Sequence, residues 1–227
     1  GSYPWSVRNA HWRALGIPEA DCEKPKIAIV NSSSELAACF SHLDQVAVQL
    51  KAAIREAGGV PFEIRTAAPS DFITGAGARG AYMLAARDLV TNDIEVAVEG
   101  AQLDGMVCLT SCDKTVPGQL MAAARLNIPT LLVPCGYQPS GEYQGRHVDI
   151  EDVFVGAMHA VTGALPLEEL IGMSREAIRG PGVCSGLGTA NSMHIVCEAL
   201  GLALPGSAPV AALSDKMMAD VRQAGAR

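Results

Sequence analysis

The chain has 227 residues, of which 49% are hydrophobic and 18% are charged, and its formal net charge is −7. This composition excludes intrinsic disorder, which requires low hydrophobicity and high charge. The acidic balance argues against a surface for nucleic acids or anionic membranes. Only 4% of the residues are aromatic, so we expect a core of small and aliphatic side chains, as is typical of layered α/β domains.

Seven cysteines are an odd number in a chain that is too long to need disulfides for stability. We therefore expect reduced thiols and a cytoplasmic protein. No segment has the roughly 18–20 consecutive apolar residues of a membrane span, and residues 1–5 lack the basic and apolar run of a signal peptide. We expect one α/β domain over residues 1–227, with residues 1–11 as an N-terminal extension and residues 1–2 as possible tag residues.

Short apolar runs alternate with helical spacing along the chain. Strands are expected at residues 26–31, 60–66, 105–110 and 129–134. Helices are expected at 44–57, 80–90, after Asn92 with Glu95 in a capping arrangement, 115–126, 150–162, 167–179, after a turn at 180–188 and up to about Gly201, and 214–225 with Ser214 as its N-cap. This alternation predicts a mostly parallel sheet with helices on both faces, which is a three-layer α/β/α fold.

The loops that follow the four strands are expected at one edge of the sheet, because the carboxyl ends of parallel strands lie together and ligands bind there. These loops are residues 31–43, 67–79, 111–116 and 135–147. Residues 75–80 have the form G-x-G-x-x-G, with Glu95 twenty residues after Gly75. We interpret this dinucleotide pattern as a chance match, because the strand that should precede it directly ends near Thr66.

Three of the cysteines lie in segments that suit inorganic chemistry. Cys112, Asp113 and Lys114 follow a buried strand directly; a thiolate suits iron–sulfur or zinc, and a carboxylate suits magnesium or calcium. The alternative is a helix cap with a solvated lysine. Cys184 lies among small residues that let the backbone approach a cofactor closely, or it is an incidental thiol in a turn. Cys39 follows the first strand, and its alternative is a buried small hydrophobe.

Three thiols on separate loops suit one iron–sulfur cluster better than a structural zinc, because the sequence contains no C-x-x-C pair. Three thiolates also leave one iron position open, as a Lewis-acid catalyst requires.

The chain from about Trp12 onward resembles the dihydroxy-acid dehydratase and phosphogluconate dehydratase family. The resemblance rests on Val30-Asn31-Ser32, Cys39-x-x-His42-Leu43, Ser70-Asp71, Cys112-Asp113-Lys114-x-x-Pro117-Gly118, Met121-Ala122, Arg125-Leu126-Asn127-Ile128-Pro129, Gly182-x-Cys184, Thr189-Ala190-Asn191-x-Met193 and Glu198-Ala199-Leu200-Gly201-Leu202-x-Leu204-Pro205-Gly206-Ser207. The interval from Asp71 through Tyr82 and Arg87 to Glu95 also matches the branched-chain type in spacing, which removes the dinucleotide interpretation.

The resemblance implies that Cys39, Cys112 and Cys184 bind an iron–sulfur cluster, either [2Fe–2S] or [4Fe–4S]. It implies that Asp71 and Asp113 bind Mg²⁺, together with Lys114, which is carbamylated in some members. Asp113 and Lys114 are thereby expected to be catalytic. The family's reaction removes water from a small 2,3-dihydroxy acid to give a 2-oxo acid, which makes the enzyme a hydro-lyase. The open iron would draw on the C3 hydroxyl, and magnesium would hold the carboxylate and the C2 hydroxyl.

The sequence departs from the family in three places. Ala38 stands where a proline usually precedes the first cysteine, and Phe72 stands where a glycine follows the first metal-binding aspartate. The Gly-Gly-Pro-like loop after the fourth strand reads Cys135-Gly136-Tyr137. These changes indicate a different acid substrate or an inactive paralog.

Family members continue into a second, β-rich domain that carries another magnesium-binding glutamate and the serine proposed as the base. Neither can be assigned in this sequence, so we expect a domain or split subunit that requires a C-terminal-domain-like partner, a homo-oligomer, or both. One alternative is a catalytically incomplete paralog that acts as a scaffold or regulatory subunit. Another is a zinc-binding structural domain.

Overall fold

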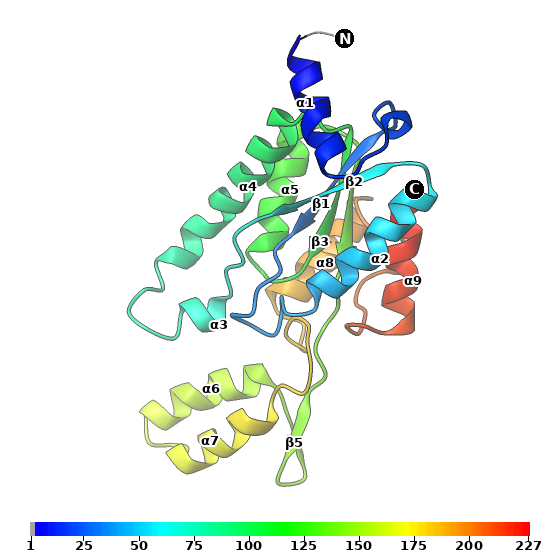
Figure 1. Ribbon diagram of the computed structural model, residues 1–227. Coiled ribbons are helices and arrows are strands. Elements are labelled where there is room, and N and C mark those ends of the chain that lie inside the picture. The colour runs from blue at the N-terminus through cyan, green and yellow to red at the C-terminus, as the bar shows by residue number, and fades with distance from the viewer. Residues whose placement is uncertain (1–2) are drawn as a thin grey trace.

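The centre of the structure is a four-stranded parallel sheet, seen in the computed structural model of Figure 1, which describes residues 3–227. The strand order is β2-β1-β3-β4. The strands are β1 (Lys26–Asn31), β2 (Val60–Arg65), β3 (Gly105–Thr110) and β4 (Thr130–Pro134). All four predicted strands and their parallel pairing are confirmed. The strands β1, β3 and β4 are largely buried, whereas β2 at the edge of the sheet is mostly half-buried.

Helices cover both faces of this sheet, so the predicted three-layer fold is confirmed. In Figure 1, α2 and α9 lie side by side on one face, and α4 and α5 lie on the other. The helices around the sheet are α2 (Leu43–Glu56), α3 (Asp71–Thr74), α4 (Tyr82–Gly100), α5 (Thr115–Leu126), α8 (Thr189–Ala199) and α9 (Asp215–Gly225). Among the helices of residues 3–227, none combines the length and apolar character that crossing a bilayer requires.

Two cores fill the spaces between the layers. Successive side chains of a strand point to opposite faces, so β1 sends Ile29 toward α2 and α9 and Ala28 toward α4 and α5. In the same way, β3 sends Leu109 into the first core and Cys108 into the second. All six residues of β3 are buried, which fixes this strand and the loop that follows it.

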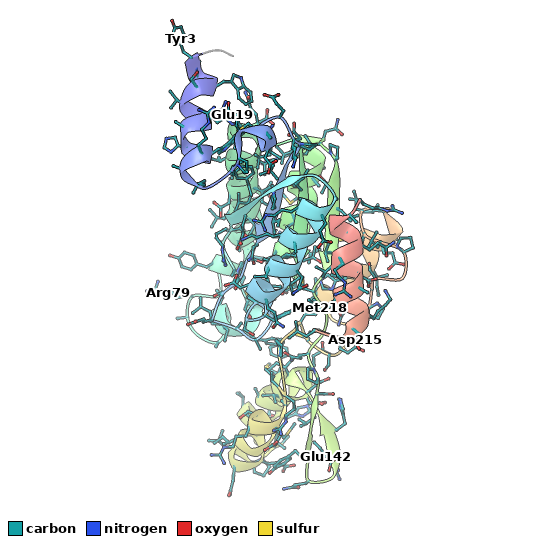
Figure 2. The ribbon with its side chains drawn as sticks, turned by 45° about the vertical axis from the view of Figure 1, so that its right-hand side comes forward. Tyr3, Glu19, Arg79, Glu142, Asp215 and Met218 are labelled. Carbon is teal, nitrogen blue, oxygen red and sulfur yellow. The ribbon has the colours of Figure 1, made fainter. Side chains whose placement is uncertain are left out.

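A separate body, which we call the arm (residues 139–181), follows the carboxyl end of β4. It contains β5 (Gly141–Tyr143), β6 (Arg146–Val148), α6 (Ile150–Val161) and α7 (Leu167–Glu176). Figures 1 and 2 both show it projecting beyond the sheet, with Glu142 on its far hairpin. The two chain segments that connect the arm to the sheet are bonded to each other: Gln138 N donates to Val183 O at 2.8 Å, and Val183 N donates to Gly136 O at 2.9 Å.

Two predicted elements differ in the structure. The break predicted near Asn92 is wrong, because α4 runs through it as one helix. Thr91 is fully buried there, and its hydroxyl donates to the carbonyl oxygens of Arg87 in α4 and Gly118 in α5, so this polar side chain is satisfied without a break in the helix. Residues 135–147 are not only a loop, because β5 and β6 form a hairpin. Its turn residues Gln144 and Gly145 both have positive φ, as a tight hairpin turn requires.

The N-terminal stretch expected as an extension contains a helix, α1 (Tyr3–Ala14), and residues 1–2 lie outside the described part of the chain. The helix is held by Trp12, whose ring lies 5.4 Å from that of Phe62 in β2. A short 3₁₀ turn, η1 (Glu19–Asp21), leads from α1 to β1. The predicted helices at 167–179 and up to Gly201 are shorter, ending at Glu176 and Ala199.

Candidate metal and cluster site

The structure brings the three predicted cysteines together at the carboxyl edge of the sheet. Cys39 lies after β1, Cys112 lies after β3, and Cys184 lies between the arm and α8. The strands β1 and β3 are neighbours, but the helices that follow them, α2 and α5, cover opposite faces. Such a reversal opens a crevice at the strand ends, which is where ligands bind in open α/β sheets.

Hydrogen bonds to backbone carbonyl oxygens tie the three cysteine loops to one another. The Ser111 hydroxyl donates to the carbonyl oxygen of Cys39, which joins the β3 loop to the β1 loop. Gly182 N donates to Ala38 O at 3.1 Å, which joins the Cys184 loop to the same segment. The segment around Cys39 is therefore fixed from both sides, although Ala38 replaces the proline expected there.

Asn191 shapes the Cys184 loop from the first turn of α8. Its side-chain amide donates to the carbonyl oxygens of Cys184 and Gly186, both at 2.8 Å. The side chain is almost fully buried. The Thr189-Ala190-Asn191 motif thus has a positioning role that needs the two donors of an amide.

The three thiols lie close enough to change one another's proton affinity. A hydrogen bond between the Cys39 and Cys112 side chains lowers the pKa of Cys39 and raises that of Cys112, and burial raises the latter further. Burial, followed by the charges of Glu151 and Cys39, raises the pKa of Cys184 to about 12. Three clustered thiols become thiolates together only when a bound cation compensates their charge. This donor set fits an iron–sulfur cluster.

The other cysteines have different surroundings. Cys135 follows β4 but points into the first core, and burial strongly raises its pKa. Cys108 and Cys197 lie in the second core, where burial likewise raises their pKa values. All seven cysteines are free thiols, in agreement with the expectation of reduced cysteines.

A second group of side chains lies beside the thiols. The Lys114 ammonium donates to Asp71 Oδ2 at 2.7 Å and to Asp113 Oδ2 at 2.9 Å. Asp71 begins α3, after β2, so two different strand ends supply the carboxylates. The Cys112 thiol donates to Asp113 Oδ1 at 3.1 Å, which links this group to the thiols.

One carboxylate oxygen of this group has no partner. Asp71 Oδ1 is buried without a hydrogen bond among the described residues, and an unsatisfied buried oxygen is costly. Burial and the nearby Asp113 carboxylate raise the pKa of Asp71. Burial would also raise the pKa of Asp113, but its interaction with Asp71 and the hydrogen bond from Lys114 lower it. Two carboxylates that compete for compensation, with one oxygen unpaired, fit a hard divalent cation such as Mg²⁺.

A sequence profile of the N-terminal part of dihydroxy-acid/6-phosphogluconate dehydratases matches residues 24–227. The chain belongs to this family. Three similar proteins, each named dihydroxy-acid dehydratase, come from Methanococcoides burtonii (40% identical over 95% of this chain), Desulfitobacterium hafniense (41% over 94%) and Ignicoccus hospitalis (37% over 98%). These alignments cover 39%, 38% and 40% of the respective relatives. The chain thus spans about two fifths of the length of the curated relatives that it matches.

The arm carries a further cluster of side chains of the kinds that bind metal ions, one histidine and two aspartates. The ligand atoms of His147, Asp149 and Asp152 lie within 4.8 Å of one another. However, Asp149 accepts hydrogen bonds from the backbone of Glu151 and Asp152, and Asp152 accepts one from the Asp149 backbone. This reciprocal pair is a capping box that begins α6. We therefore interpret the group as a helix cap. The Asp-x-x-Asp spacing was a sequence signal for it.

The arm also supplies a wall of the candidate site that sequence reasoning missed. The ring of Phe154 in α6 lies 5.5 Å from that of Phe72, the residue after Asp71. One turn earlier, the Glu151 carboxylate lies against Gly186 and Gly188, where a Cβ on either glycine would overlap it. Burial, with the charges of Asp149 and Asp152, raises the pKa of Glu151. The two glycines were the only sequence signal for this contact.

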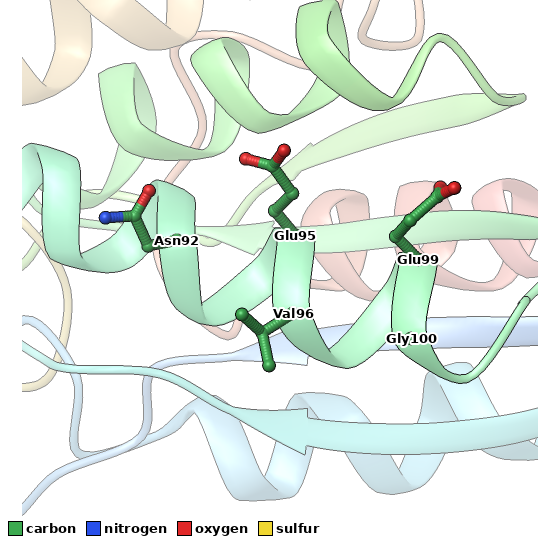
Figure 3. Close-up of a pocket in the computed structure, with 5 residues that line it drawn as sticks. All are labelled: Asn92, Glu95, Val96, Glu99 and Gly100. Carbon is green, nitrogen blue, oxygen red and sulfur yellow. The ribbon is translucent and has the colours of Figure 1, made fainter.

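Two hollows lie away from this site. One runs along the outside of α4 beside Asn92, Glu95 and Glu99 (Figure 3), and Glu95 there pairs with Arg125 at 2.9 Å. The other is a cavity of about 630 Å³ at the opposite, amino-terminal edge of the sheet, where Gly105 is one of the lining residues. Neither contains a predicted site residue, and the pattern at 75–80 lies between α3 and α4, away from any strand end.

Proposed function

We propose that this chain is the cofactor-binding part of a hydro-lyase that converts a 2,3-dihydroxy acid to a 2-oxo acid. In this reaction the C2–H proton and the C3 hydroxyl leave as water, and the resulting enol becomes the 2-oxo acid. The observation that carries the proposal is the unpaired Asp71 Oδ1 beside three clustered thiols. Family membership supports the same reaction class.

Cys39, Cys112 and Cys184 would hold the iron–sulfur cluster, and Asp71, Asp113 and Lys114 would hold Mg²⁺. When bound, the cluster and the metal supply Lewis acids for a hydroxyl and a carboxylate. Lys114 would serve as a carbamate, which has the oxygen donors that magnesium prefers.

The side chains of this site prepare it before a metal arrives. Although burial opposes it, hydrogen bonds to Asp71 and Asp113 raise the pKa of Lys114. The ammonium therefore occupies the position between the two carboxylates and keeps them together. To become a carbamate, the Lys114 ammonium must lose two protons, take up CO2 on its nitrogen and leave this position, so we expect carbamate formation and magnesium binding to be linked.

The base that removes the C2 proton is not assigned to a residue of this chain. We propose that a partner chain or a further domain, corresponding to the part of the relatives outside the aligned region, completes the site. A homo-oligomer can contribute in the same way. The substrate would be a small hydroxy acid.

Metal analysis after anaerobic reconstitution tests the cluster. We expect a brown protein with iron and sulfide, and we expect Cys112→Ser to lose both while the core variant Cys197→Ala keeps them. The cluster proposal would be wrong if wild-type protein stays colourless and iron-free, or if it takes up stoichiometric zinc without sulfide.

A second candidate is a scaffold or regulatory paralog, favoured by the aromatic pair of Phe72 and Phe154 beside Asp71. Bulky rings next to a metal carboxylate reduce the room for a substrate. Mixing the reconstituted chain with a protein that supplies the missing domain separates the two candidates. Formation of a 2-oxo acid only in the mixture supports the split enzyme, and its absence with a loaded cluster supports the scaffold.

A further inference from the structure

We infer that Glu151 determines substrate specificity at the proposed site, by accepting a hydrogen bond from a donor group on the substrate chain beyond C3. The inference rests on the proposed function and deepens it. The donor that we propose is a hydroxyl, so the preferred substrate is a polyhydroxylated acid. A purely aliphatic chain would be disfavoured.

The first turn of α6 carries Glu151 from the arm to the thiols. Asp149 caps this helix through both Glu151 N and Asp152 N, so the backbone of the turn is fixed. The carboxylate then lies against Gly186 and Gly188, with a Gly188 Cβ position only 2.9 Å from its Oε1. These glycines leave the space that the carboxylate fills, two to four residues after Cys184.

The contact between Phe72 and Phe154 keeps the first turn of α6 beside the carboxylates proposed to bind magnesium, Asp71 and Asp113. Phe154 lies three residues after Glu151, so both side chains are on one face of α6. The contact between Phe154 and Phe72 joins this face to the segment that begins with Asp71. Glu151 is therefore connected to both halves of the proposed site, to the cluster loop directly and to the metal carboxylates through the rings.

Glu151 has no compensating group among residues 3–227. Its neighbouring charges are those of Asp149 and Asp152, which repel it, and neither a cation nor a hydrogen-bond donor stabilises it. A carboxylate that is partly withdrawn from water gains most from a donor that a ligand brings. A ligand that offers only methyl groups would bury the carboxylate further without a partner, and sites with such polar groups reject apolar analogues strongly.

Equilibrium binding by titration calorimetry tests this role on the anaerobically reconstituted chain with Mg²⁺. Three acids serve as probes: D-gluconate with hydroxyls, 5-amino-2,3-dihydroxypentanoate with an ammonium, and 2,3-dihydroxy-3-methylbutanoate with methyl groups. We expect wild-type protein to bind gluconate at least tenfold more tightly than the methyl-bearing acid, the effect of one hydrogen bond to a charged group. We expect Glu151→Val to remove this preference, and Glu151→Gln to keep part of it.

Glu168→Val, on the exposed first turn of α7, is the matched control and should bind all three acids as wild type does. Unchanged melting temperature and iron content show that Glu151→Val keeps its fold and its cluster. Equal preferences in wild type and Glu151→Val would overturn the inference, as would wild-type protein that binds the methyl-bearing acid as tightly as gluconate; the proposed function survives both results. Tightest binding of the ammonium-bearing probe, 5-amino-2,3-dihydroxypentanoate, would keep the role of Glu151 but overturn the assignment of a hydroxyl as the donor. Binding of none of the acids to loaded protein overturns this inference alone, because the proposed function is judged by iron content and by 2-oxo acid formation in the mixture.

Discussion

His194 should make the stability of this domain depend on pH well above the range where carboxylates titrate. The side chain is 1% exposed, and its Nε2–H donates to the carbonyl oxygen of Ser111 at 3.1 Å. Burial lowers the pKa of His194 from 6.5 to about 4. As the pH falls below about 6.5, the His194 imidazole becomes protonated in the unfolded chain. In the folded chain it stays neutral until about pH 4.

The unfolded state therefore binds more protons across this window, and stability falls as the pH falls. A pKa difference of this size corresponds to about 3 kcal/mol in full, of which about 2.5 kcal/mol is lost between pH 7 and pH 4.5. Burial lowers the pKa of His42 as well, so its contribution has the same sign. Urea unfolding of the metal-free chain, followed by circular dichroism at several pH values, measures the loss.

The variant His194→Gln isolates this contribution. Its amide can still donate to Ser111 O but does not titrate, and the carboxylates that also respond to acid are unchanged. We expect the unfolding free energy of wild type to fall by about 2.5 kcal/mol more than that of the variant as the pH is lowered from 7 to 4.5. Curves that stay parallel over this range would refute the reasoning that His194 is buried in its neutral form.

Three further substitutions test the site and the packing. Asp71→Asn should weaken Mg²⁺ binding at least tenfold in a metal titration without lowering iron content, because it removes a charged oxygen donor; equal binding would contradict the assignment. Gly118→Ala should cost about 1–3 kcal/mol in urea unfolding, because its Cβ would lie 2.9 Å from Val90 in α4. Leu50→Ala should cost about 2–5 kcal/mol, since Leu50 is fully buried. Leu84→Ala, 67% exposed, is its control and should change stability by less than about 0.5 kcal/mol.

Most of the sheet could be predicted from the sequence because β1, β3 and β4 are largely buried, although the edge strand β2 is mostly half-buried. A run such as Lys26–Asn31 is short, apolar and β-branched, and only a strand between two helical layers uses such a run throughout. The edge position of Cys39 and Cys112 followed from the parallel topology, because each lies in a loop that directly follows a strand, whereas Cys184 lies between the arm and α8. The contacts of Cys39 and Cys112 agree with that prediction.

The arm was less predictable because its contacts are long-range. The break expected at Asn92 in α4 was wrong for the same reason, because the hydroxyl of the neighbouring Thr91 is satisfied by the Gly118 carbonyl oxygen on α5. Glu151 and Gly186 are thirty-five residues apart, and no local pattern shows that one fills the space left by the other. Such pairs depend on where the arm folds back, and that is set by packing and not by propensity.

The lysine between Asp71 and Asp113 has a consequence for the order of assembly. With both carboxylates ionised, Lys114 leaves the group with a net charge of −1. In the proposed loaded state, two carboxylates, a carbamate and Mg²⁺ also sum to −1. The net charge of the group beside Cys112 is therefore the same before and after the metal binds. On this ground we expect the thiols to take up iron and sulfide whether or not magnesium is already bound.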